Sequence, residues 1–130
     1  MKLWVDDIRP APPGWTGVET ISQAINALDR FCHADYINPG ITHVSLDHDI
    51  SIPVKVGGQW YNRPSPDTFQ VVAKYMVCML EGTNPSLNPD IVVTTHSSNP
   101  LGRKAIVELL DDVGVECKET PLEQTNRINN

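Results

Sequence analysis

The sequence lacks any long apolar run, and its hydrophobic stretches fall well short of the roughly 18 residues that suggest a membrane span. Acidic residues follow the first methionine too soon for a signal peptide. Positive charge is also scarce, with 10 Lys and Arg against 16 Asp and Glu and a net charge of −6, which argues against binding to duplex nucleic acid. We therefore expect a cytoplasmic protein without a membrane contact, although a local site can still hold a small phosphorylated ligand.

Cysteines are few and unpaired in spacing. Cys32, Cys78 and Cys117 show no metal-binding pattern, and their apolar surroundings predict reduced, buried thiols. The sequence also contains no Walker loop, no G-x-G-x-x-G and no nucleophilic Ser-His-Asp motif. At 130 residues the chain is long enough for one domain, which we place at residues 1–118, with a polar tail at 119–130.

Short apolar runs alternate with helical periodicity along the chain. Thr20 and Gln23 form a capping box before the first helix, Ser65-Pro66 marks the start of the second, and Gly82 ends it as a left-handed cap. This alternation predicts an α/β fold with a parallel sheet and helices on both faces. The predicted strands are 3–5, 16–19, 42–46, 91–95 and 115–117, and the predicted helices are 21–32, 66–81 and 100–113.

Between the third strand and the second helix, two alternating runs at 52–56 and 59–62 flank Gly57-Gly58. This pattern predicts a β-hairpin inserted after the third strand. Two interpretations of the segment 50–64 stay open, namely a lid that folds back over the strand ends and an excursion into solvent.

Acidic residues directly follow two of the predicted buried strands. Asp6 and Asp7 follow the first strand, and Asp47 follows the third, with Asp49 two residues later. Because ligands of open α/β sheets bind beyond the carboxyl ends of the strands, we expect these carboxylates to meet at one edge. Clustered carboxylates repel each other unless a hard cation offsets the repulsion. We therefore predict a site for Mg²⁺ or Mn²⁺, the alternative being separately solvated loop acids.

Two histidines stand at the same predicted strand ends. His48 follows Asp47, and His96 follows the strand at 91–95. Imidazole titrates near neutral pH, so a pair can supply one base and one acid. We predict that His48 orients or deprotonates water, that His96 protonates a leaving oxygen, and that Asp47 takes part in catalysis. The alternative for each histidine is a hydrogen-bonded loop residue.

Small polar residues lead into the last predicted helix. Ser97, Ser98 and Asn99 precede it, and a helix N-terminus offers free backbone N–H groups to an anion. Arg103, one turn into the helix, and Arg9, in the first loop, can add charge-assisted contacts to phosphate. These residues are candidate substrate-binding groups, although ordinary capping by Ser98 or Asn99 explains part of the same pattern.

Three motifs carry a family resemblance. LWVDDIRPAPPGW at 3–15, SLDHD at 45–49 and HSSNPLG at 96–102 resemble the cyclic-phosphate processing receiver domains, which are divergent relatives of response-regulator receiver domains in bacteria and phages. The resemblance implies a flavodoxin-like parallel sheet of order 2-1-3-4-5. It departs from ordinary receivers because the Pro-rich loop 10–15 replaces the first helix and only Lys118 could stand for the usual lysine.

Three hypotheses follow for the function. The first is metal-assisted hydrolysis of a small cyclic phosphate, either a cyclic nucleotide or a 2′,3′-cyclic phosphate end. The second is a non-enzymatic domain that captures a phosphorylated ligand or partner. The third is a receiver that accepts phosphate at Asp47. All three place a small phosphorylated group at the edge where the strands end.

Overall fold

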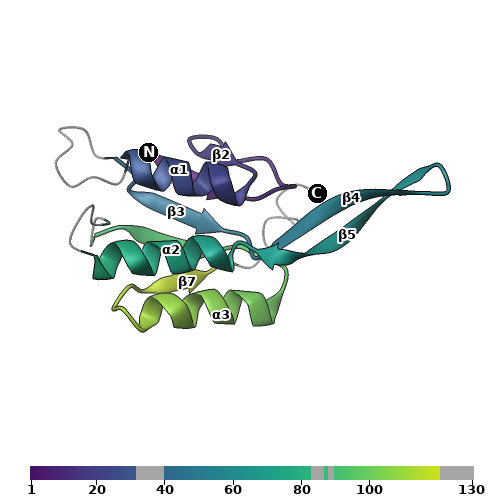
Figure 1. Cartoon of the computed structure of the whole chain (residues 1–130). Helices are drawn as coiled ribbons and strands as arrows, with labels where there is room; N and C mark the ends of the chain where they lie inside the picture. The colour runs from purple at the N-terminus through teal and green to yellow at the C-terminus, as the bar shows by residue number, and fades with distance from the viewer. Residues whose placement is uncertain (32–39, 83–86, 88–89, 121–130) are drawn as a thin grey trace.

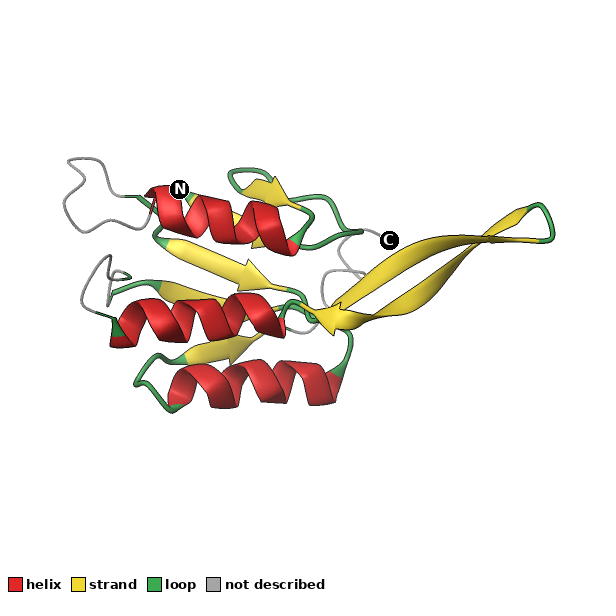
Figure 2. Cartoon of the chain, viewed as in Figure 1, coloured by secondary structure: helices red, strands yellow, loops and turns green. Residues whose placement is uncertain are grey.

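Strands and helices alternate along the chain as the sequence predicts (Figures 1 and 2). The computed structural model describes residues 1–31, 40–82, 87 and 90–120. The strands of the main sheet are β1 (Lys2–Val5), β2 (Thr16–Val18), β3 (His43–Leu46), β6 (Val92–Thr95) and β7 (Cys117–Glu119). The helices are α1 (Ile21–Phe31), α2 (Gln70–Glu81) and α3 (Pro100–Asp111).

The main sheet is parallel throughout, in the order β2-β1-β3-β6-β7. When the strands of this sheet alone are numbered in chain order, with β4 and β5 left out, the order becomes 2-1-3-4-5. This is the expected order, so the predicted fold class is confirmed. The central position of β6 is confirmed as well, because β6 lies between β3 and β7. The last strand occupies Cys117–Glu119 rather than 115–117.

All three helices pack on one face of the sheet, whereas the sequence analysis expected helices on both faces (Figure 2). The reason is the direction of the crossovers. The connections through α1, α2 and α3 each step the same way across the sheet, and right-handed crossovers then place their helices on the same side. The step from β1 to β2 runs the other way, and the loop 10–15 makes it without a helix.

The core lies between that face of the sheet and the helices. Leu3, Val5, Val44, Leu46 and Val93 point toward the helices and are buried. The helices contribute further buried side chains, which are Ala24, Leu28, Val72, Ala73, Met76, Met79, Ile106 and Leu110. The strand residues that alternate with these core residues point to the other face of the sheet, which we call the helix-free face.

The first and last helices begin as their cap signals predict. The Thr20 hydroxyl accepts a hydrogen bond from the Gln23 backbone N–H, while the Gln23 side chain accepts one from the N–H of Glu19. At α3, the side chain of Asn99 caps the helix ahead of Pro100. Local capping chemistry therefore places both helix starts.

The predicted start of α2 at Ser65-Pro66 is wrong. Strand β5 continues through this dipeptide, and the helix begins after Phe69, which is fully buried. The Phe69 N–H donates to the carbonyl of His48, so burial and a tertiary hydrogen bond set the boundary in place of a side-chain cap. Gly82 does follow the helix, but with φ −78° it is extended and not left-handed.

The cysteines and the end of β7 bear on two smaller predictions. Of the cysteines, Cys117 is buried and Cys78 is exposed, while Cys32 lies outside the described residues. The Thr120 N–H donates to the carbonyl of Thr95, so sheet contacts continue to residue 120. Most of the predicted tail, residues 121–130, also lies outside the described residues.

The hairpin forms as predicted, from β4 (Asp49–Val56) and β5 (Gln59–Thr68). It projects away from the sheet instead of folding back as a lid (Figure 1). Its strands pair only with each other, and most of its side chains are exposed, including Trp60 at 68%. Among the described residues, no helix is long and apolar enough to cross a bilayer.

Candidate functional site

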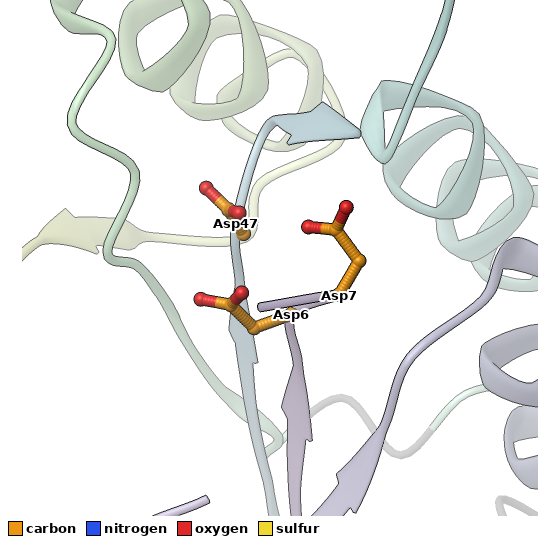
Figure 3. Close-up of side chains that lie close together, drawn as sticks. All are labelled: Asp6, Asp7 and Asp47. Carbon is orange, nitrogen blue, oxygen red and sulfur yellow. The ribbon is translucent and has the colours of Figure 1, made fainter. Parts of the chain in front are cut away.

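Three carboxylates converge at the carboxyl ends of β1 and β3 (Figure 3). The register pairs Val5 with Leu46, so the residues that follow them, Asp6 and Asp47, come side by side. Oxygens of Asp6, Asp7 and Asp47 lie within 4.8 Å of one another. The strand-end rule therefore places these three predicted residues together.

Asp6 is buried, and both of its carboxylate oxygens have polar partners. Its Oδ1 accepts from the backbone N–H groups of Ile8 and Arg9, both at 2.9 Å. Its Oδ2 lies 3.2 Å from Arg9 Nη1 and 2.9 Å from His96 Nε2. Burial alone would raise the pKa of Asp6, but the hydrogen bonds from His96, Arg9 and Ile8 outweigh it, and the pKa lies below its ordinary value. Asp6 is thus held as a carboxylate.

Asp47 is equally buried but less well compensated. Its Oδ1 accepts from the His48 backbone N–H at 2.8 Å, and its Oδ2 lies 3.6 Å from Arg9 Nη1. Burial and the neighbouring charge of Asp6 raise the pKa of Asp47 above its ordinary value, against the opposing effects of the His48 N–H, His96 and Arg9. The charge on Asp47 therefore costs free energy in the absence of a further cation.

Asp7 supplies the observation that best fits a metal. Its Oδ2 accepts from the Ser51 N–H at 2.7 Å, but its Oδ1 is buried without a hydrogen-bond partner in the described chain. An unpaired buried carboxylate oxygen is costly unless something coordinates it. Three carboxylates around one small volume also form the oxygen donor set that Mg²⁺ or Mn²⁺ prefers. The residues present fit a hard divalent cation.

His96 lies behind Asp6 and is 1% exposed. Its Nε2 contacts Asp6 at 2.9 Å, its Nδ1 lies 2.7 Å from the Ser45 hydroxyl, and its ring stacks on Trp4 with centroids 3.7 Å apart. Both ring nitrogens are therefore occupied inside the chain. The arrangement fixes the ring and, through it, the orientation of the Asp6 carboxylate.

His48 and Asp49 form a second group beside the cluster. His48 Nδ1 lies 2.8 Å from Asp49 Oδ1, and the same oxygen accepts from Asn99 Nδ2 at 3.2 Å. Because Asp49 takes up the Nδ1 of His48, the Nε2 of the same ring can bond a ligand or water. Asp49 is mostly exposed and bonds His48 and Asn99, so it stands apart from the three carboxylates that share one volume.

The His48 ring packs against the first turn of α3. A Cβ built on Gly102 would lie 2.3 Å from His48 Cγ, so the ring occupies the space that a side chain at 102 would need. The Gly102 N–H itself is taken by Asn99 Oδ1 at 3.1 Å. Gly102 thus allows the contact between His48 and α3.

The predicted phosphate-binding residues have different surroundings. Ser97 is buried and its hydroxyl accepts from the Asn99 N–H, and Arg103 contacts Glu119 and the carbonyl of Ser97. Through these bonds Ser97, Asn99 and Arg103 hold the loop before α3 in place. In contrast, Ser98 is exposed, and the Arg9 side chain is 37% exposed between Asp6 and Asp47.

Sequence reasoning missed three supporting residues. Trp4 and Ser45 hold the His96 ring, and Gly102 makes room for His48. Trp4 and Ser45 alternate along their strands with the core residues, so they face away from the helices. This alternation is the local signal in the sequence for their position. The glycine inside a helical pattern was the signal for Gly102.

Comparison with known proteins identifies the family. The family model of the cyclic-phosphate processing Receiver domain matches residues 1–112 of the chain. This span contains β1 to α3 and every residue of the three-carboxylate cluster. No curated protein and no solved structure matches the chain.

Proposed function

The chain belongs to the cyclic-phosphate processing Receiver domain family, and from this premise we propose that it hydrolyses a small cyclic phosphate with a divalent cation. The carrying observation is the three-carboxylate cluster with its buried, unpartnered Asp7 oxygen. Asp6, Asp7 and Asp47 would hold Mg²⁺ or Mn²⁺. When bound, the cation supplies Lewis-acid polarisation of phosphoryl oxygens and a more acidic water.

The negative charge of the carboxylate cluster would repel a phosphate, so its binding requires positive groups nearby. The cluster carries three carboxylates, and the cations that contact it in the described chain are Arg9 and, when protonated, His96. Arg9 touches both Asp6 and Asp47 through one nitrogen and is partly exposed, so its other N–H groups can contact phosphate oxygens. We assign phosphate binding to Arg9 and to the exposed hydroxyl of Ser98.

Proton transfer is assigned to His48. Asp49 Oδ1 contacts His48 Nδ1 and accepts from Asn99 Nδ2, which fixes the ring and keeps Nε2 available as an acceptor. In the proposed reaction the water oxygen bonds to phosphorus, one ring ester bond breaks, and the water proton goes to His48 Nε2. The departing ester oxygen then takes a proton from His48 or from solvent. His96 positions Asp6 in place of acting as the acid.

A hydrolysis screen tests the proposal. Purified protein is incubated with 2′,3′-cyclic nucleotides, 3′,5′-cyclic nucleotides and cyclic oligonucleotides in Mg²⁺, Mn²⁺ or EDTA, and ring opening is followed by ³¹P NMR. We expect turnover that EDTA and Asp47→Ala abolish and that His48→Gln lowers by about 10²-fold or more. The control is Asp111→Ala, an exposed carboxylate on the last turn of α3. Metal-dependent turnover that survives Asp47→Ala would contradict the proposal.

A second candidate is capture of a phosphorylated ligand without chemistry. The observation in its favour is that both ring nitrogens of His96 are engaged with Asp6 and Ser45. Among the described residues this leaves one imidazole nitrogen at the site, His48 Nε2, instead of two. Under this candidate the same screen gives no product. The cyclic nucleotide would still raise the melting temperature in Mn²⁺, and Asp47→Ala would remove that rise.

A further inference from the structure

The helix-free face of the sheet is unusual for a parallel sheet. Parallel sheets occur almost only with both faces covered. Here Pro12 and Trp15 of the loop 10–15 lie over this face, and Val92 in the centre of the sheet is 46% exposed. Within the part of the chain that the structure describes, the face therefore presents Val92, a strand residue that ordinary folds of this class would bury.

Aromatic side chains shape a cavity on this face. The Trp15 ring stands at 77° to the Trp4 ring with centroids 6.0 Å apart, and at 76° to the His43 ring with centroids 6.2 Å apart. The cavity between these rings and the strands has a volume of about 320 Å³. Its further lining residues are Pro12, Ser45, Val92, Thr94, His96 and Thr120.

The charges around the cavity select against a cationic occupant. None of the described lining residues is acidic, although the chain as a whole carries a net charge of −6. Lys2 places its Nζ 5.7 Å from the centre of the Trp15 ring, so a positive charge already occupies the outside of that ring. Aromatic cages that bind cations gain from the negative faces of the rings. With Lys2 in place, a neutral or anionic ring is the better occupant.

Polar groups at the cavity are free to recognise a ring edge. His43 uses Nδ1 for the Thr42 hydroxyl, and within the described chain its Nε2 has no hydrogen-bond partner. The hydroxyls of Thr94 and Thr120 likewise make no hydrogen bond to described residues. An apolar, aromatic cavity with a few convergent polar groups is typical of a small-ligand site, and the volume lies at the lower end of the usual range of about 300–1,000 Å³.

We propose that this cavity binds a planar, uncharged or anionic heteroaromatic ring, of the chemical class of a nucleobase. The ring stacks on Trp15 or Trp4, and its edge meets His43, Thr94 and Thr120. The site is separate from the carboxylate cluster, with Trp4 and His96 standing between the two. The proposal does not depend on the hydrolytic function, because it concerns a ring without a phosphate.

Nucleosides test the proposal, since they carry the ring and no phosphate. The protein contains three tryptophans, and Trp60→Phe removes the exposed one on the hairpin, leaving Trp4 and Trp15 as fluorescent reporters. Adenosine, guanosine, cytidine and uridine are titrated into this variant. We expect saturable quenching by at least one nucleoside, and equilibrium dialysis of the wild-type chain gives its affinity.

Two further variants locate the binding. Trp15→Leu removes a stacking wall and should weaken the affinity by about fivefold or more, and Val92→Phe fills the mouth of the cavity from an exposed position and should abolish binding. Asp47→Asn should leave nucleoside binding unchanged, which separates this site from the hydrolytic one. Absence of saturable binding, or binding that survives both variants, would overturn the proposal. So would a wild-type dimer in sedimentation that Val92→Phe dissociates, because a second copy would then cover the face.

Discussion

Replacing Asp47 by Asn should make the metal-free protein more stable. At an effective dielectric constant of about 20, two carboxylate oxygens no more than 4.8 Å apart repel by about 3.5 kcal/mol or more. Asp47 has two such neighbours, Asp6 and Asp7. Attraction to Arg9 at 3.6 Å returns about 4.6 kcal/mol at the same dielectric constant, and less in practice because Arg9 is 37% exposed. A net repulsion on the order of 2 kcal/mol is left.

Asn keeps the size of the side chain and can still accept from the His48 N–H, although more weakly than a carboxylate. We therefore expect Asp47→Asn to gain about 1 to 2 kcal/mol, which corresponds to an increase of about 4 to 8 °C in the melting temperature for a chain of this length. The measurement is thermal unfolding followed by circular dichroism at pH 7 in EDTA.

Metal should reverse the ranking. At a concentration of 100 times Kd, a bound cation stabilises the wild type by about 2.7 kcal/mol. The Asn variant lacks one ligand and should gain far less from Mn²⁺ or Mg²⁺. Asp49→Asn is the matched control, because this carboxylate stands nearby but outside the cluster. A folded Asp47→Asn protein that melts lower than the wild type in EDTA would refute the repulsion argument, and equal gains from Mn²⁺ would refute the metal assignment.

Three further outcomes are expected. Gly102→Ala, which ordinarily favours a helix, should instead cost about 1 to 3 kcal/mol in urea unfolding because the new methyl group meets the His48 ring, and a gain in stability would contradict this packing. Asp6→Asn should lower the melting temperature at pH 7, since hydrogen bonds hold the pKa of Asp6 below its ordinary value. This deficit should shrink as the pH falls from about 4 toward the lowered pKa of the folded protein, because the unfolded wild type takes up the proton first, and a pH-independent deficit would count against it. Burial, with a smaller effect of Glu119, raises the pKa of Cys117 to about 12, so iodoacetamide at pH 8 should label exposed Cys78 before Cys117, as peptide mass spectrometry would show.

Much of the site could be predicted from the sequence because the carboxyl ends of neighbouring parallel strands lie at the same edge of the sheet. Asp6, Asp47 and His96 each follow a buried strand directly, and parallel neighbours bring such residues to one edge. What could not be predicted was how the groups share their partners. That His96 has both nitrogens occupied depends on Ser45, which is 51 residues away. The Arg9 contact with two carboxylates likewise depends on the path of the loop.

The errors in the fold have a common cause. Ser65-Pro66 is a sound local signal for a helix start, but Phe69 is buried against the domain and pairing with β4 continues to Thr68, so tertiary contacts outweigh the signal. The expectation of helices on both faces came from the general pattern of parallel sheets. It failed because the loop 10–15 makes the one crossover that runs in the opposite direction.

The projecting hairpin has a consequence for aggregation. A two-stranded ribbon has two open edges, and each edge offers backbone groups that can recruit a strand from another molecule. Three prolines interrupt these strands, Pro53, Pro64 and Pro66, and each removes one backbone N–H donor from the ribbon. Lys55 and Arg63 add like charges along the same ribbon. The hairpin can therefore extend far into solvent while its own composition discourages fibrous association between copies.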